Sequence, residues 1–267
     1  MLKVTSKDNL NIKYIQKLVK SSKFRRCESA FVIEGARLCK DAFLSNVDIL
    51  LLVATDDAIE KNTVLIKDIE NVAKEKILVP NSIFKLISDT KTPQGILCVC
   101  KINRSELVVN NGKFCALENV QDPVNLGTIL RTAEALGING IVISADCCDI
   151  YSPKVVRGSM GAIFRVPFII TENFVDYIDT LQKNGATCFA STPCSSAQKI
   201  TKVNFNNYKT SVVLIGNEGN GLTNNAINTC KSTVTIPMLS KAESLNASVA
   251  ASILMWEMLR SGGNENE

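Results

Sequence analysis

The stretch VVLIGNEGNGLT, residues 212–223, decides the fold of this chain. Four apolar residues lead into a loop with glycines at 216, 219 and 221, a pattern typical of a strand that ends in a ligand-binding turn. The loop is neither G-x-G-x-x-G nor a Walker A sequence, and Glu218 would repel phosphate groups. The stretch therefore favours a ligand held by backbone groups, with Glu218 organising a nearby cation, over a nucleotide pyrophosphate.

The surrounding pattern predicts two α/β modules. In the second module, residues 113–267, strands are expected at 114–118, 140–144, 186–190, 212–216 and 233–236, and helices at 126–136, 153–158, 173–184 and 246–260. In the first module, residues 1–105, strands are expected at 31–33, 47–54, 76–79 and 96–102, and helices at 13–20, 34–44, 57–74 and from Asn81. The polar residues 106–112 are expected to be a linker.

Composition excludes several classes of enzyme. The 267 residues include no histidine, which excludes Ser-His-Asp triads, Cys-His dyads and H-E-x-x-H zinc sites. The ten cysteines form no paired C-x-x-C ligand sets, so we expect no metal site and mostly core thiols. The first residues lack the apolar region of a signal peptide, and no apolar run is long enough to cross a bilayer. We expect a cytoplasmic protein with no membrane association.

Charge is uneven along the chain. Residues 1–112 carry 18 Lys and Arg against 13 Asp and Glu, whereas residues 113–267 carry 12 against 13. Eight of the basic residues lie within the first 26 positions. Such a basic arm is the expected footprint of phosphate binding, and a solvated helix face is the equally weighted alternative.

Two further stretches contain polar residues at strand-to-helix junctions. In LENVQDPVNLGTILRTAEALG, residues 117–137, Asn125 is expected at the helix N-cap and Arg131 in the second turn. An arginine extending beside an apolar helix face would explain Arg131 without any function. In VTIPMLSKAESLNASVAASILMWEML, residues 234–259, the Ser244-Leu245-Asn246 loop precedes an amphipathic helix, and simple capping is the alternative reading.

Together, these three stretches in this order resemble the SpoU (TrmH-like) RNA 2′-O-ribose methyltransferases of the SPOUT, or α/β-knot, superfamily. The resemblance spans residues 113–260 and includes SPKVVRGSMGAIFRVPF, residues 152–168. The stretch SKFRRCESAFVIEGARLCKDA, residues 22–42, is similar to the substrate-binding domain often joined to that catalytic domain. The resemblance implies a trefoil-knotted α/β domain with a parallel sheet, preceded by a smaller α/β domain with a ribosomal-protein-like fold. It also implies a homodimer.

The resemblance implies that S-adenosylmethionine is the cofactor, held mainly by backbone groups. The matching positions in this sequence are Thr192, Gly216, Ile236 and Leu245. Methyl transfer from a sulfonium depends on in-line placement of the ribose 2′-oxygen, and the lack of histidine is no obstacle to it.

The family's proposed base corresponds to Arg131, although a guanidinium normally stays protonated. An alternative is that Arg131 holds a substrate phosphate while another group accepts the proton. The other matching polar residues are Asn125, Glu218, Ser244 and Asn246. We expect Glu218 and Asn125 to orient Arg131, and Ser244 and Asn246 to form the ribose and cofactor pocket.

The first module is then expected to bind RNA. The candidate contacts are Lys23, Arg25, Arg26 and Arg37. Large-subunit rRNA is favoured as the substrate over tRNA by the two-domain layout. A catalytically inactive RNA-binding or ribosome-assembly factor is the alternative from a different class. We also expect that removing residues 1–105 would leave cofactor binding intact and abolish RNA selectivity.

Overall fold

The computed structural model describes residues 1–103, 107–238 and 244–260. These residues form two compact units. The first unit contains residues 1–103 and 149–165, and the second contains the described residues of 104–148 and 166–267. The division at 1–105, 106–112 and 113–267 stays a prediction about functional domains. Residue 106 of the expected linker lies outside the described residues, as do residues 104 and 105.

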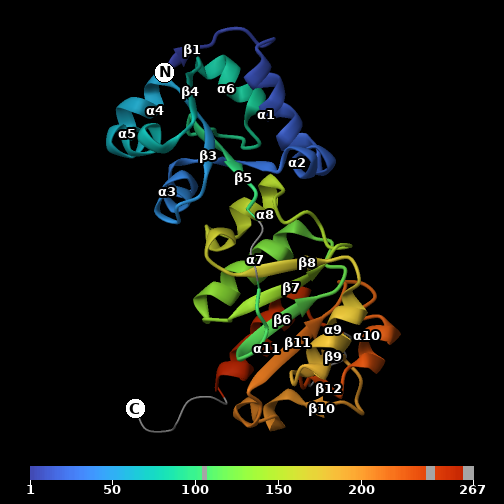
Figure 1. Ribbon diagram of the computed structural model, residues 1–267. Helices are drawn as coiled ribbons and strands as arrows, with labels where there is room; N and C mark the ends of the chain where they lie inside the picture. Colours follow the sequence, from blue (N-terminus) through green and yellow to red (C-terminus); the bar gives the residue numbers. More distant parts are fainter. Residues whose placement is uncertain (104–106, 239–243, 261–267) are drawn as a thin grey trace. The chain divides into compact units, whose positions relative to one another are not determined.

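The first unit is built on a mixed five-stranded sheet (Figure 1). Its strand order is β1 (Leu2–Lys3), β4 (Glu75–Leu78), β3 (Ile49–Ala54), β5 (Ile96–Lys101) and β2 (Ala30–Glu34). Strands β1, β4 and β3 run parallel to one another, and β5 runs antiparallel to both β3 and β2. Because side chains alternate along each strand, both faces of the sheet present apolar residues to helices.

Residues 1–103 of this unit form six helices: α1 (Leu10–Lys20), α2 (Ser22–Glu28), α3 (Ala36–Leu44), α4 (Asp56–Lys61), α5 (Thr63–Val72) and α6 (Asn81–Ile87). Buried residues of α1 and α6, such as Ile15 and Phe84, pack with Val32, Val53 and Val99 of the sheet. The expected helix over 57–74 is divided at Asn62, which ends α4 and precedes α5. Strand β1 and helix α2 were not expected from the pattern.

The segment 149–165 belongs to the first unit although the sequence boundaries put it in the second module. It contains α8 (Pro153–Gly158) and a short 3₁₀ turn, η1 (Ala162–Phe164). The ring of Phe31 on β2 lies 4.9 Å from the ring of Tyr151 and 6.4 Å from that of Phe164. Removal of residues 1–105 would therefore strip this segment of its packing partners. The expectation that such a truncation leaves cofactor binding intact and abolishes RNA selectivity stays a prediction.

The second unit contains a seven-stranded sheet in which every pair of neighbours is parallel. Its order is β10 (Gln198–Lys199), β12 (Ser232–Thr235), β9 (Thr187–Ser191), β11 (Thr210–Ile215), β6 (Gly112–Leu117), β7 (Gly140–Ser144) and β8 (Phe168–Thr171). The predicted α/β fold with a parallel sheet is confirmed. The pattern missed the short edge strands β8 and β10, and the trefoil knot stays a prediction.

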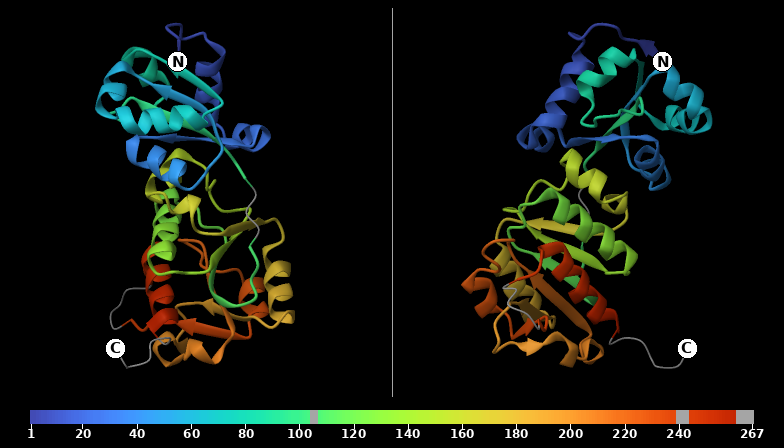
Figure 2. Two further views of the ribbon diagram at one scale, coloured as in Figure 1. Left: turned by 60° about the vertical axis from the view of Figure 1, so that its left-hand side comes forward. Right: turned by 180° about the vertical axis from the view of Figure 1, so that it is seen from behind.

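Helices cover both faces of this sheet (Figure 2). Helices α9 (Phe174–Lys183) and α10 (Asn224–Thr229) bury Ile178 and Ala226 against strand residues such as Phe114 and Val212. Helices α7 (Pro123–Ala135) and α11 (Ala247–Arg260) contact each other, and α11 also contacts β6 and β11. No helix among the described residues is long and apolar enough to cross a membrane.

Helix α7 begins earlier than the sequence pattern indicates. Its N-cap is Asp122, whose side chain accepts a hydrogen bond from the Val124 backbone N–H. Pro123 occupies the first helical position, where its missing N–H carries no penalty. The prediction that Asn125 caps the helix is therefore wrong. Asn125 lies inside the first turn of α7 and is buried. Because its side-chain amide does not cap the helix, it can bond to other loops.

Candidate functional site

Four loops meet at one edge of the parallel sheet. Strands β12, β9, β11 and β6 are neighbours, and their last residues are Thr235, Ser191, Ile215 and Leu117. The register pairs Ile215 with Leu117 and Leu214 with Ala190, so the carboxyl ends lie level. Ligands of parallel α/β sheets bind at this edge, beyond the carboxyl ends of the strands. The sheet thus brings together the loops that contain the three motifs.

Glu218 joins the loop after β11 to the loop after β6. Its carboxylate accepts hydrogen bonds from the backbone N–H groups of Gln121 at 3.1 Å and Asp122 at 3.0 Å. It also accepts one from Asn125 Nδ2 at 2.9 Å. Burial raises the pKa of Glu218, but these donors lower it further, so the net pKa lies below its ordinary value. Glu218 is therefore a carboxylate at neutral pH and acts as an acceptor.

Asn125 extends this network to the third motif. Its Oδ1 accepts a hydrogen bond from Asn246 Nδ2 at 3.0 Å. The Oδ1 of Asn246 in turn accepts from the backbone N–H and hydroxyl of Ser248, at 2.9 and 2.7 Å, and from Val249 N at 3.3 Å. Asn246 therefore caps α11, as the simple reading of the sequence indicates, and also binds Asn125. Its expected place in the ribose and cofactor pocket stays a prediction.

The glycine loop closes on itself. Asn217 and Gly221 exchange backbone hydrogen bonds of 3.0 and 2.9 Å, and a Cβ on Gly216 would lie 2.1 Å from the carbonyl carbon of Gly221. Gly216 is thus required by the return of its own loop. Asn217 also donates from Nδ2 to the Asn119 carbonyl at 2.9 Å, which binds the loop to the end of β6.

Glu118 fixes the far end of the same loop. This buried side chain accepts hydrogen bonds from the backbone N–H of Thr223 at 2.8 Å and from its hydroxyl at 2.7 Å. Thr223 is the N-cap of α10. Sequence reasoning missed Glu118 and Asn217, although a carboxylate directly after a buried strand could have indicated the first of them.

Arg131 lies on the exposed side of α7. Among the described residues, the hydrogen bonds of Glu218 and Asn125 go to each other and to the residues already named, and none of them reaches Arg131. The expectation that Glu218 and Asn125 orient Arg131 is therefore not met in the single chain. These two residues hold the loops together instead. Ser244 lies exposed just before α11, next to the undescribed residues 239–243.

The four expected cofactor contacts lie directly after strands of the sheet or within the third motif. Thr192 follows β9 and donates its backbone N–H to the Val234 carbonyl at 2.9 Å. Gly216 follows β11, and Ile236 follows β12 and is partly buried. The side chain of Leu245 is 37% exposed. Three of these positions directly follow neighbouring strands, and Leu245 directly precedes Asn246, which binds Asn125.

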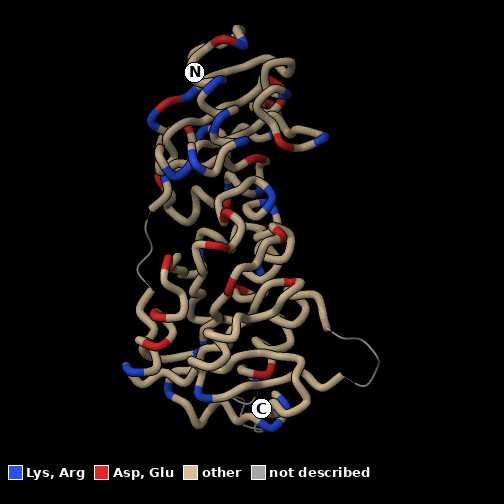
Figure 3. The backbone as a smooth tube through the Cα atoms, turned by 90° about the vertical axis from the view of Figure 1, so that its right-hand side faces the viewer, with Lys and Arg blue, Asp and Glu red and all other residues tan. Residues whose placement is uncertain are grey.

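The four expected RNA contacts of the first unit differ in exposure. Lys23, Arg26 and Arg37 are exposed, and Lys and Arg positions recur along this unit (Figure 3). Arg25 is only 4% exposed, and its guanidinium binds Asp149 and the carbonyls of Leu18 and Val19. The prediction that Arg25 contacts RNA is wrong, because its guanidinium group is buried and already bonded to these three partners.

No group of three or more acidic or cysteine side chains suited to a metal ion is found among the described residues. The same part of the chain contains no disulfide. Burial raises the pKa of the Cys115 thiol to about 12, as expected of a core cysteine.

Comparison with known protein families gives a direct assignment. The model of the SpoU rRNA Methylase family matches residues 113–256. The chain belongs to the SpoU rRNA methylase family. The MRM3-like substrate binding domain matches residues 9–98. The resemblance indicated by the three motifs is thereby confirmed, together with the similarity of the first module to a substrate-binding domain.

Relatives of this SpoU-family chain match it over nearly its whole length. It is 28% identical over 260 residues to the 23S rRNA (guanosine(2553)-2′-O)-methyltransferase RlmP of Bacillus subtilis, covering 97% of this chain and 99% of the relative. The AdoMet-bound rRNA methyltransferase of Sinorhizobium meliloti superposes with a TM-score of 0.85 at 27% identity, covering 98% of each chain. A TrmH-family protein of Porphyromonas gingivalis gives 0.83 at 30% identity, covering 94% of this chain and 98% of that one.

Proposed function

We propose that this chain is an S-adenosylmethionine-dependent methyltransferase that modifies a ribose 2′-hydroxyl of large-subunit rRNA in the cytoplasm. The observation that carries the proposal is the hydrogen-bonded chain Glu218–Asn125–Asn246, which joins all three family motifs at the ligand-binding edge of the sheet. The full-length match to a 23S rRNA 2′-O-methyltransferase supports rRNA as the substrate, because that match includes the first module.

The loops suit a cofactor held by backbone groups. Thr192, Gly216 and Ile236 follow neighbouring strands, and Leu245 adds an apolar side chain. These four residues would hold S-adenosylmethionine, which supplies a methyl group on a positively charged sulfonium. The carboxylate of Glu218, kept ionised by its three donors, gives this region a fixed negative charge that favours a cation.

When bound, S-adenosylmethionine would supply the methyl group to the ribose 2′-oxygen. The 2′-hydroxyl proton would pass to Arg131 if its guanidine is neutral, or to solvent water if Arg131 stays protonated and holds the substrate phosphate. Glu218 is held by three donors, which suits it to positioning better than to proton transfer. Arg131 is the candidate for the substrate ribose and its phosphate, and Ser244 and Asn246 border the same region.

We further propose that the chain works as a homodimer through α7 and α11. Val124 on α7 and Val249 and Trp256 on α11 are 63%, 47% and 57% exposed. The two helices contact each other, and Val124 and Arg131 are seven residues apart on the exposed side of α7. Helical spacing places such residues on one face. A second copy covering this face would enclose Arg131 and bring it partners beyond those that the described residues of one chain supply.

The proposed RNA-docking surface lies on α1 and α2. The exposed cations there are Lys13, Lys17, Lys20, Lys23 and Arg26. Lys17 Nζ lies 5.5 Å from the centre of the Phe24 ring, and Phe24 contacts Tyr14 edge to face at 5.7 Å. Cations beside partly exposed rings are suited to binding phosphates and bases.

The test is methyl transfer by the purified full-length chain with labelled S-adenosylmethionine. Unmodified transcripts of large-subunit rRNA and of tRNA are offered separately, and ribose methylation is mapped in total RNA from cells with and without the protein. We expect one 2′-O-methylated position in large-subunit rRNA, which Arg131→Ala abolishes. Methylation confined to tRNA would contradict the rRNA assignment. RNA binding without any methyl transfer would instead indicate the inactive assembly factor.

A further inference from the structure

Arg25 is a buried cation whose partners lie far apart in the sequence. Its Nε and Nη2 lie 2.7 and 2.6 Å from Asp149 Oδ2. Its Nη1 donates to the carbonyls of Leu18 and Val19 near the end of α1. The side chain of Arg25 is 5% exposed and that of Asp149 is 20% exposed. One side chain therefore ties the end of the helix that carries the basic surface to the segment 149–165.

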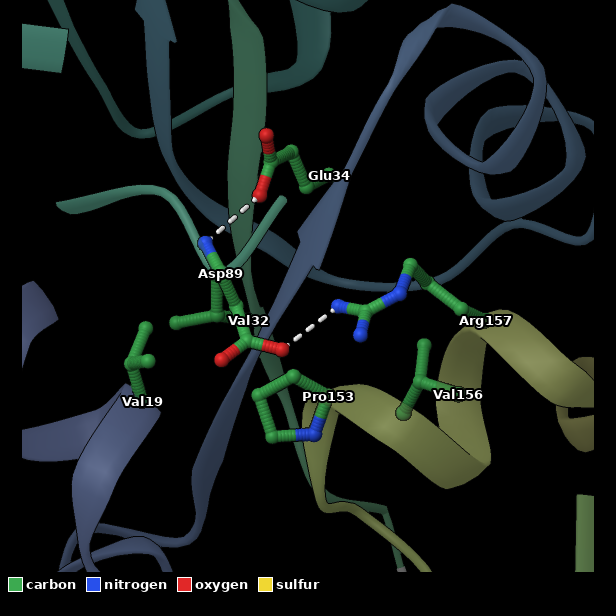
Figure 4. Close-up of a pocket in the computed structure, with 7 residues that line it drawn as sticks. All are labelled: Val19, Val32, Glu34, Asp89, Pro153, Val156 and Arg157. Carbon is green, nitrogen blue, oxygen red and sulfur yellow. Dashed lines mark hydrogen bonds and ion pairs between the residues drawn. The ribbon is translucent and has the colours of Figure 1, made fainter. Parts of the chain in front are cut away.

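Two other ion pairs hold the same segment within the first unit. Arg157 on α8 donates to Asp89 Oδ2 at 2.8 Å, and Asp89 N donates to Glu34 at 3.0 Å (Figure 4). These residues border a small cavity of about 10 Å³. Arg165 lies 4.0 Å from Asp41. Three arginine–aspartate pairs therefore tie residues 149–165 to the rest of the first unit.

The residues directly before Asp149 hold the first catalytic loop within the second unit. Asn119 N donates to Ser144 Oγ at 2.9 Å, and Val120 N donates to Cys147 Sγ at 3.2 Å. The Cys148 backbone N–H donates to the Val120 carbonyl at 2.8 Å. The next two residues of that loop, Gln121 and Asp122, supply the backbone donors of Glu218.

We propose that Arg25 and Asp149 are positioning residues that link RNA docking on α1 and α2 to the catalytic loop 119–122. The link is covalent at Cys148–Asp149, where the chain passes from one unit to the other. Within the first unit, the link runs from Asp149 through Arg25 to the end of α1. Within the second unit, it runs from Cys148 through Cys147 and Ser144 to the loop 119–122. This inference rests on the proposed function, since it concerns how bound RNA reaches the methyl-transfer site.

The substitution Asp149→Asn tests the link without disturbing the local turn. Asp149 Oδ1 accepts from Tyr151 N at 3.0 Å, and asparagine retains that oxygen. Only Oδ2, the partner of Arg25, is replaced. Single-turnover methyl transfer to an unmodified large-subunit rRNA transcript is measured at saturating RNA and S-adenosylmethionine. The rate should fall about tenfold, because small displacements of reacting groups have large effects. The dissociation constants of the transcript and of S-adenosylmethionine should change less than about twofold.

Two further variants complete the test. Asp89→Asn removes the partner of Arg157, which lies on the segment 149–165. We expect the single-turnover rate of methyl transfer to fall about threefold. Asp179→Asn removes a comparable carboxylate from the exposed Asp179–Lys183 pair on α9 and should leave the rate unchanged.

The outcomes separate the two proposals. An inactive wild-type chain overturns the proposed function and this inference with it. If the wild type is active, an unchanged rate for Asp149→Asn overturns the inference alone, as does weaker RNA binding with an unchanged rate at saturation. If Asp149→Asn no longer binds S-adenosylmethionine, Asp89→Asn decides: a reduced rate supports the link and an unchanged rate overturns it.

Discussion

Asn246 Nδ2 donates a hydrogen bond to Asn125 Oδ1 at 3.0 Å, across 121 positions of sequence. The orientation of each amide is fixed by its second hydrogen bond. Asn125 Nδ2 donates to Glu218, and Asn246 Oδ1 accepts from the start of α11. Because a carboxylate accepts and a helix start donates, the two amides can point in only one direction. Glu218 therefore fixes the orientation of both amides. As an acceptor it requires Asn125 Nδ2 to face it, which leaves Asn125 Oδ1 to accept from Asn246.

Glu218→Gln should therefore weaken the site more than its small change in shape suggests. The new amide nitrogen would face one of three donors and lose its hydrogen bond. Hydrogen bonds to a charged group contribute about 1.5–3 kcal/mol, so we expect S-adenosylmethionine affinity to fall about 10- to 100-fold. Isothermal titration calorimetry measures this directly. Glu257→Gln is the control, since Glu257 lies on α11 and binds Arg260 three residues away. Unchanged affinity for Glu218→Gln would contradict the central position of this carboxylate.

Asn125→Asp should destabilise the second unit. The substitution places a second carboxylate against Glu218, at a position where the present distance is 2.9 Å, and neither oxygen can donate to it. We expect the free energy of unfolding to fall by about 2 kcal/mol or more at neutral pH. Asn224→Asp is the matched control, because Asn224 is exposed in the first turn of α10. Urea unfolding measures both, and equal losses in the two variants would count against the network.

Acid should weaken the same contact with a defined sign. The pKa of Glu218 in the folded chain is lowered by its donors relative to the unfolded chain, where it is about 4.3. Its stabilising contribution is thus complete above the unfolded value and is lost as pH falls through the lower folded value. We expect the difference in unfolding free energy between wild type and Glu218→Gln to be constant from neutral pH to about pH 5 and to shrink below about pH 4. A difference that grew on acidification would reverse this assignment.

Much of the fold followed from periodicity, whereas the site depended on contacts that periodicity does not contain. The long buried strands β6, β7 and β11 lie where alternating α/β patterns indicated them. The start of α7 lies elsewhere than the pattern indicated. Asp122 caps the helix and Pro123 begins it, about one turn before Asn125. Arg25 was read as one cation among several, since nothing local shows that Asp149, 124 positions later, neutralises it.

Thr223→Val should loosen the far end of the glycine loop. It removes the hydroxyl that donates to Glu118 and caps α10 at Ala226 N. Loss of a cap and of a buried acceptor's partner together cost about 2 kcal/mol. Thr223→Ser retains the hydroxyl and should behave as wild type. Thr229→Val is the control on the same helix, where the hydroxyl donates only to the Asn225 carbonyl. Thermal unfolding followed by circular dichroism measures the three, and a normal melting temperature for Thr223→Val would show that Glu118 does not fix this loop.

Trp256→Glu should separate the proposed homodimer. An obligate interface buries apolar side chains at its centre, and a carboxylate there would remain unpaired on association. Trp256 is 57% exposed in the single chain and lies seven residues from Val249 on the same face of α11. Light scattering after size exclusion should give twice the chain mass for wild type and one chain mass for the variant. Val64→Glu places the same charge on α5, where Val64 is 74% exposed, and should stay dimeric. Methyl transfer should fall with dimer content, because Arg131 lies on the same exposed side of α7 as Val124. A monomeric wild type with full activity would overturn both the dimer and this role of the exposed face.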